Sequence, residues 1–209
     1  MLTFDLLYQT IGAAYLAVLT YPNLPLDPAL IAQLEQSRPA VSGQNGYAAL
    51  RALPLQASDN LPKDLPRCGR DTPDCLAQAR EHLAGWRAIA PAWRETWQMQ
   101  DAMLDALRQY DYFRPLPEQY NGKTWPTFVL PLLGTSLNAY RFAAGEHDAA
   151  LHGACRDAKL GLRFIQSHGL VLQSLVGIAL VERNIALLAQ MRAELPPETP
   201  LPADCNALQ

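Results

Sequence analysis

The seventeen prolines of this chain gather mainly in four stretches. Because proline lacks a backbone N–H and its ring clashes with the preceding helical turn, these stretches should lie between the regular elements. The segments that separate them carry apolar residues at helical spacing, and none shows the sustained two-residue alternation that predicts strands. The sequence therefore predicts an all-α fold. The proline stretches cover residues 22–28, 54–73, 115–131 and 196–202.

A chain of 209 residues is long enough for one domain, which can remove roughly 70% of its unfolded surface from water. We expect a single-domain bundle of about six to eight helices over residues 22–195. An apolar segment at residues 1–21 precedes it, and a proline-rich tail at residues 196–209 follows. Lys and Arg total 17 and never form a run of four, so the basic surface that nucleic-acid binding requires is not expected.

Capping residues place several helix ends. Thr72-Pro73-Asp74 combines a capping side chain with an early proline, which is typical of a helix start. Pro91 should then break or kink the chain. Gly169 should end a later helix by supplying the left-handed C-cap conformation. The expected helices cover about residues 28–35, 47–53, 73–89, 93–110, 131–144 (or from 126), 147–167 and 171–191.

The last helix is the most apolar, and we expect it to lie centrally in the bundle, buried on more than one side. Glu182-Arg183-Asn184 interrupts it, either to line a pocket or as a single exposed strip. Its main apolar stripe comprises Val171, Leu175, Ile178, Val181, Ile185 and Leu188, and further aliphatic residues are Leu172, Val176, Leu180 and Leu187.

Residues 137–162 predict two helices joined by a turn at Gly145. Tyr140, Ala150, Leu151 and Ala154, together with that glycine, give this pair some likeness to a tetratricopeptide hairpin. One imperfect copy does not make a repeat array. A generic antiparallel helix pair is the alternative interpretation.

The apolar segment at residues 1–21 has two interpretations. Its length and composition approach those of a membrane anchor or a signal peptide, but Asp5 and Pro22 limit the apolar run. Anchors and signal peptides normally carry basic residues before the apolar run, whereas the first positive charge of this chain is Arg38. The other interpretation is a buried first helix.

The four cysteines allow two disulfides. Cys68 and Cys75 flank a short segment with Gly69 and Pro73, and closure of this loop would bring their α-carbons within the required distance of about 4.4 to 6.8 Å. Cys155 and Cys205 would then form a second pair that ties the tail to the bundle, although sequence alone leaves three connectivities. Disulfides imply an oxidising compartment, and four reduced thiols in the cytoplasm are the alternative.

Asp148, His152 and Cys155 are the sharpest chemical constellation, because their spacing puts all three on one helix face. They are candidate catalytic residues, and a surface histidine beside a disulfide or core cysteine is the simpler interpretation. Asp101 and Asp105 likewise lie one turn apart, as paired carboxylates or as a solvated ion-pair face. No phosphate-binding glycine loop, dinucleotide motif or zinc-ligand spacing occurs, so we expect neither a cofactor nor a metal.

These features together resemble a family of uncharacterised proteobacterial proteins. The resemblance is carried by the apolar segment that leads into Pro22-Asn-Leu-Pro-Leu26, by Asn45-Gly-Tyr-Ala-Ala-Leu50, by the loop from Cys68 to Cys75 and by the helix over residues 175–191. It implies a helical domain anchored in the inner membrane through residues 1–21 and facing the periplasm. The resemblance implies no activity and no catalytic residues.

Two functions are compatible with these observations. The first is an accessory or scaffolding protein at the cell envelope that binds another protein through a helical surface. Tyr112, Tyr120 and Trp125 are the candidate contacts, because exposed aromatic residues often anchor interfaces. The second is an enzyme, or a binder of an apolar small molecule, that uses a pocket between helices.

Overall fold

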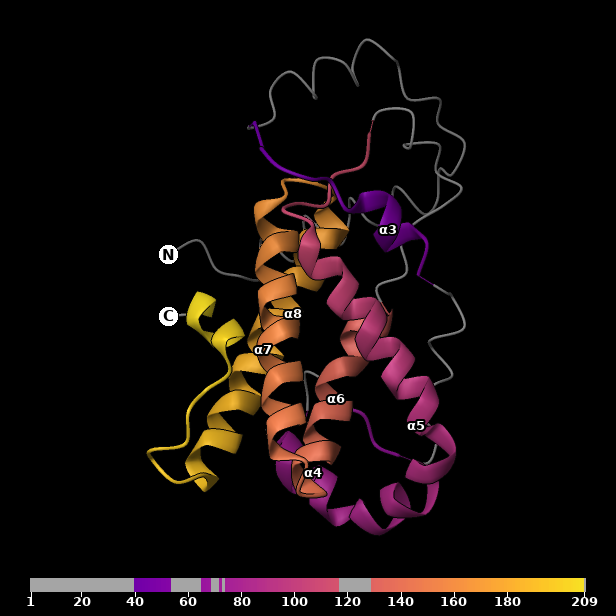
Figure 1. The fold of residues 1–209 in the computed structure, drawn as a ribbon, viewed down its shortest axis with the longest axis vertical. Helices are drawn as coiled ribbons and strands as arrows, with labels where there is room; N and C mark the ends of the chain where they lie inside the picture. The colour runs from indigo at the N-terminus through magenta and orange to yellow at the C-terminus, as the bar shows by residue number, and fades with distance from the viewer. Residues whose placement is uncertain (1–39, 54–64, 69–71, 73, 117–128, 209) are drawn as a thin grey trace. The chain divides into compact units, whose positions relative to one another are not determined.

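A computed structural model describes residues 40–53, 65–68, 72, 74–116 and 129–208 (Figure 1). About 72% of these residues are helical and they contain no strand, which confirms the all-α, single-domain fold. The apolar segment 1–21 and the helix expected at residues 28–35 lie outside the described residues. The helices belong to one compact unit, residues 39–115 and 125–209. They are α3 (Tyr47–Arg51), α4 (Cys75–Glu81), α5 (Leu83–Ala106), η2 (Leu107–Gln109), α6 (Val129–Ala143), α7 (His147–Gln166), α8 (Val171–Glu194) and η4 (Ala203–Leu208), where η denotes a 3-10 helix.

The region around Pro91 differs from the prediction. A helix begins close to the predicted start, but its cap is Asp74 rather than Thr72: the side chain of Asp74 accepts a hydrogen bond from the backbone N–H of Ala77 (2.8 Å). The helix ends at His82, however, and α5 continues without a break through Pro91. Pro91 is exposed, so water can hydrogen-bond the carbonyl that its ring leaves unpaired. The predicted break at Pro91 is therefore wrong, whereas the kink predicted as its alternative stays a prediction.

Helices α6 and α7 form the antiparallel pair that the sequence predicts, and Gly145 joins them with a positive φ of 95°. The tetratricopeptide likeness of this pair is not confirmed. At the end of α7 the left-handed residue is His168 (φ 47°) rather than the predicted Gly169. Glycine is needed at position 169 for space, because a Cβ there would lie 2.9 Å from the carbonyl oxygen of Phe113.

Helices α7 and α8 lie side by side (Figure 1) and touch through two glycines. A Cβ on Gly161 of α7 would lie 2.7 Å from the carbonyl oxygen of Gly177, and a Cβ on Gly177 would lie 2.6 Å from that of Gly161. Both distances are too short for a real side chain. The two backbones therefore approach each other as closely as they do because both positions lack a side chain.

Helices α6 and α7 are more deeply buried than α8. Every residue of α6 from position 133 to position 142 is buried. Tyr140 of α6 stacks on Trp86 of α5, with ring centroids 5.0 Å apart, and Trp86 stacks in turn on Trp97 at 4.0 Å. Trp86 and Trp97 of α5 thus belong to the core. Stacked aromatic pairs contribute roughly 0.5–1.5 kcal/mol each beyond the area that they bury.

Candidate functional site

The predicted constellation on α7 is not assembled. Cys155 is fully buried and bonded to Cys205, so it offers no thiol. Asp148 is exposed in the first turn of α7. His152 faces two other carboxylates, with Nδ1 3.4 Å from Asp204 and Nε2 3.8 Å from Asp105. A shared helix face does not bring the three side chains together, because the face is wide. Cys155 at one edge is buried in the core, whereas Asp148 at the other edge is exposed to solvent.

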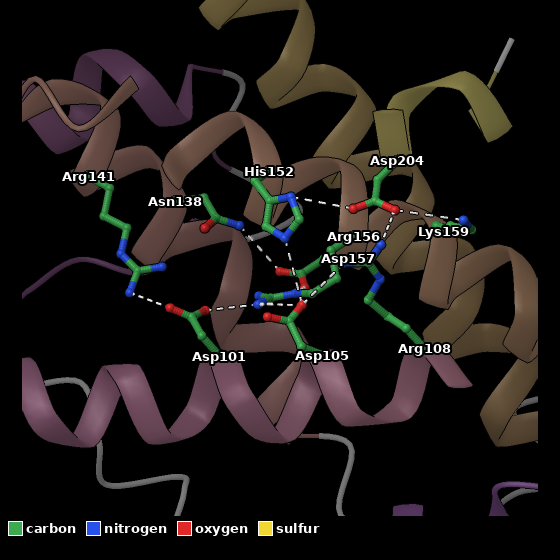
Figure 2. Close-up of polar contacts among 10 residues, drawn as sticks. All are labelled: Asp101, Asp105, Arg108, Asn138, Arg141, His152, Arg156, Asp157, Lys159 and Asp204. Carbon is green, nitrogen blue, oxygen red and sulfur yellow. Dashed lines mark hydrogen bonds and ion pairs between the residues drawn. The ribbon is translucent and has the colours of Figure 1, made fainter. Parts of the chain in front are cut away.

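The structure instead joins α5, α6, α7 and η4 through a group of polar side chains, which we call the charged network (Figure 2). It contains four carboxylates, three arginines, one lysine, one histidine and one asparagine. Its members come from parts of the chain that are more than one hundred residues apart. They are Asp101, Asp105, Arg108, Asn138, Arg141, His152, Arg156, Asp157, Lys159 and Asp204.

The inner half of the charged network is buried. Arg156 donates from Nε to Asp157 (2.8 Å) and from Nη1 to Asp101 (2.9 Å), and its side chain is 2% exposed. Arg141 reaches the other oxygen of Asp101 at 2.6 Å. Asn138 donates to the second oxygen of Asp157 at 3.3 Å. Helices α5, α6 and α7 are therefore cross-linked by charge-assisted hydrogen bonds, which are stronger than neutral ones.

Burial and pairing set opposite pKa shifts on the two inner carboxyl groups. Burial alone would raise the pKa of Asp101, but the hydrogen bonds and charges of Arg141 and Arg156 outweigh it and hold that pKa below its usual value. Burial raises the pKa of Asp157, which is completely buried, and its contacts with Arg156 and Asn138 offset this only in part. For Arg156, the nearby carboxylates overcome burial and raise the pKa further, so the guanidinium stays charged.

Two glycines make room for the inner half. A Cβ on Gly134 of α6 would overlap the carboxylate of Asp157, and one on Gly153 of α7 would overlap the side-chain amide of Asn138. The polar groups therefore occupy the space that a larger side chain would fill at each helix crossing. Between α6 and α7, each glycine therefore faces a polar side chain of the other helix.

The outer half of the charged network holds the C-terminal segment against α7. Asp204 pairs with Arg108, and it lies 3.7 Å from Lys159 and 3.4 Å from His152. The neighbouring residue is Cys205, bonded to Cys155 with a Cα–Cα distance of 5.0 Å. The tail is thus tied back to the bundle by one covalent link and several ion pairs, as the second cysteine pair implies.

Acidic and basic groups of the charged network are paired with one another. Each carboxylate faces at least one permanent cation, and the four acids balance the four bases. In the described part of the chain, no group of three or more His, Cys, Asp or Glu side chains could hold a metal ion.

The centre of this network, Arg156 and Asp157, was not predicted from the sequence. The spacing of Asp101 and Asp105 predicts paired carboxylates or a solvated ion-pair face, and no role was predicted for Arg156 and Asp157. A signal was available, because these two opposite charges are adjacent and stand among the small and apolar residues of α7. Charges on an apolar face need partners of opposite charge. Asp101 is a candidate partner for Arg156, because a second acid, Asp105, lies one turn away on the same helix.

The other disulfide lies at the start of α4. Cys68 is bonded to Cys75 with a Cα–Cα distance of 5.3 Å, as the loop spacing predicts. The backbone N–H of Cys68 also donates to the hydroxyl of Ser136 in α6 (2.9 Å). This loop is therefore fixed to α6 as well as to the start of α4.

The aromatic residues proposed as partner contacts are only partly described. Tyr112 is half-buried, and its backbone carbonyl accepts a hydrogen bond from the N–H of Gly46 (2.8 Å). Its backbone thus helps to hold the chain before α3 against the chain after η2. Tyr120 and Trp125 lie outside the described residues.

The exposed apolar residues of α8 form a surface that the sequence placed in the core. Val171 is 65% exposed, Ile178 50% and Ile185 42%, whereas Leu180 and Leu187 on the opposite side are buried. The predicted central position of α8 is therefore wrong, and the stripe chosen as its buried face is largely the solvent face. We call this surface the α8 stripe, and it comprises Val171, Leu175, Ile178, Glu182, Ile185 and Ala189.

The three polar residues that interrupt α8 do not act together. Asn184 is buried and donates to the carbonyl of Leu180 (2.9 Å), while Glu182 is exposed and Arg183 half-exposed. They form neither a pocket lining nor a single strip.

Among the described helices, α8 alone is long and apolar enough to cross a membrane by length and composition, and about a third of that stretch is buried in the protein. No protein-family model, curated protein or solved structure matches this chain, so the family resemblance stays a prediction.

Proposed function

We propose that this protein is an accessory or scaffolding protein of the bacterial cell envelope, and that it binds a helix of another protein along the α8 stripe. The observation that carries the proposal is the row of exposed aliphatic side chains at Val171, Leu175, Ile178 and Ile185. A row of exposed aliphatic side chains of this kind on a folded domain is typical of an interaction site. The stripe replaces the aromatic residues near Tyr112 as the main candidate contact.

The rest of the bundle supports this role by holding α8 in place. Helix α8 packs closely on α7 through Gly161 and Gly177, and α7 is tied to its neighbours by the charged network and by the disulfide from Cys155. A binding surface on a rigid support loses less conformational entropy when the partner binds. The two disulfides support an oxidising compartment, and with the family resemblance they favour the periplasm over the cytoplasm.

The test compares the proteins recovered with the wild-type chain from native cell envelopes with those recovered with two variants. Ile178→Asp puts a charge into the α8 stripe, and Met99→Asp puts the same charge at an exposed apolar position on α5. We expect a defined protein to be recovered with the wild type and with Met99→Asp but lost with Ile178→Asp. Circular dichroism and thermal unfolding check that both variants are folded. Recovery of the same proteins with all three chains would contradict the proposal.

A further inference from the structure

The α8 stripe has the spacing of a coiled-coil seam. Its positions 171, 175, 178, 182, 185 and 189 follow one another at intervals of four, three, four, three and four. This is the heptad pattern through which two helices pack side chains into each other's gaps. A helix is therefore the partner shape that the stripe fits best.

One member of the stripe is charged. Glu182 stands at its centre, with aliphatic residues or alanine at the other five positions. It is exposed, and it makes no ion pair within the described part of the chain. A helix that covered the stripe would remove Glu182 from water, and this is costly unless the covering surface supplies a positive charge.

A second copy of this chain that covers the whole stripe does not supply that charge. In a parallel pair of α8 helices, Glu182 would face Glu182 of the other copy, and in an antiparallel pair it would face Ile178. Arg183 lies one position beyond the seam and points away from it. The apolar segment 1–21 of the same chain has no positive side chain. A lipid bilayer would leave the carboxylate in hydrocarbon, at a cost that few proteins accept without a partner group.

Charge complementarity therefore selects one kind of occupant. We infer that the partner of the α8 stripe is an amphipathic helix of another protein, with a lysine or arginine in its apolar seam opposite Glu182. This inference rests on the proposed function and adds the chemistry of the partner. The carboxylate sets the register of the two helices, because only one alignment pairs the two charges, as a polar residue does within a coiled-coil seam.

The experiment uses the full chain and three synthetic helical peptides of about three heptads each. All have leucine in the seam, and they differ at one central position, which is arginine, leucine or glutamate. Binding is measured by fluorescence anisotropy with labelled peptide at nanomolar concentration, so that the peptides do not pair with themselves. The proteins are the wild type, Glu182→Arg and Ile178→Asp, with Met99→Asp as the matched surface control.

We expect the wild type and Met99→Asp to bind the arginine peptide at least about tenfold more tightly than the glutamate peptide. Glu182→Arg should reverse that preference, and Ile178→Asp should abolish binding of all three peptides. Equal affinities for the arginine and glutamate peptides, or tightest binding of the leucine peptide to the wild type, would overturn the inference. So would a dimer seen in sedimentation, or binding to vesicles of phosphatidylethanolamine and phosphatidylglycerol, if Ile178→Asp removes either one.

The two proposals can fail separately. If a protein recovered from cell envelopes is lost with Ile178→Asp but the peptides show no charge preference, the inference about Glu182 fails and the proposed function stands. If Ile178→Asp loses no protein from cell envelopes, the proposed function fails whatever the peptides show.

Discussion

Replacing Gly161 with alanine should loosen the contact between α7 and α8. The new Cβ would lie 2.7 Å from the carbonyl oxygen of Gly177 and 2.9 Å from Cβ of Leu180. Ordinary contact begins at 3.4 Å, so the helices must separate by about 0.7 Å or deform locally. Overpacking of this kind costs roughly 1–3 kcal/mol. The obstacle is backbone, which cannot turn aside, so we place the cost at the upper end of that range.

Alanine also favours a helix over glycine by about 1 kcal/mol. The net effect of Gly161→Ala should therefore be a loss of about 2 kcal/mol in the free energy of unfolding, or roughly 4–8 °C in Tm for a chain of this size. Urea unfolding followed by circular dichroism, with the disulfides intact, measures it. Gly85→Ala is the matched control, because Gly85 is exposed on α5 and its Cβ would lie 3.5 Å from Leu65. That variant should gain roughly 0.5–1 kcal/mol. A Gly161→Ala protein as stable as the wild type would refute the reasoning.

Two further predictions concern the charged network and the disulfides. Asp101→Asn should cost about 2 kcal/mol at pH 7. The pKa of Asp101 is lowered in the folded protein, so its contribution is present above the unfolded pKa of about 4 and is lost as pH falls through the folded value. The difference from the wild type in urea unfolding should therefore shrink toward pH 3, and a constant difference would contradict the assignment. Replacing Cys155 and Cys205 with alanine should cost about 4 kcal/mol, and replacing Cys68 and Cys75 about 2, because their sequence separations are 50 and 7. Equal losses, or the reverse order, would show that loop length does not govern these bonds.

Several helix ends could be predicted because they depend on local chemistry, but the boundary between α4 and α5 at His82 was not among them. Asp74 caps α4 and Gly145 turns the chain between α6 and α7, and both effects act over a few residues. A break was wrongly predicted at Pro91, because the effect of a proline on a helix depends on whether it lies on the exposed or the buried side. Pro91 lies on the exposed side of α5. That side is set by tertiary packing rather than by the proline itself.

The orientation of α8 could not be predicted, because the helix is apolar almost all round and so its pattern does not choose a face. The choice depends on Gly177, which lets α8 approach Gly161 and so turns Val176 and Leu180 inward. The stripe predicted to be the buried face of α8 was the one with the larger and more regular aliphatic side chains. In the structure much of that stripe, including Ile178, faces solvent.

The charged network lay beyond sequence analysis for another reason. Its ion pairs join residues from three helices and the C-terminal segment, so each pairing depends on the complete fold. The acid at position 101 could be found from its spacing to Asp105, but its true partners, Arg141 and Arg156, lie 40 and 55 residues further along the chain. Charge alone does not choose among so many candidates.

The most direct test of the α8 stripe as a binding surface is photo-crosslinking in living cells. A photoreactive amino acid in place of Ile178 should yield one dominant crosslinked protein, and mass spectrometry should map the link to a helix of that protein. The same group in place of Ala102, which is exposed on α5, serves as the control and should not give that product. No crosslink at position 178, or the same products from both positions, would contradict the claim that α8 presents the partner-binding surface.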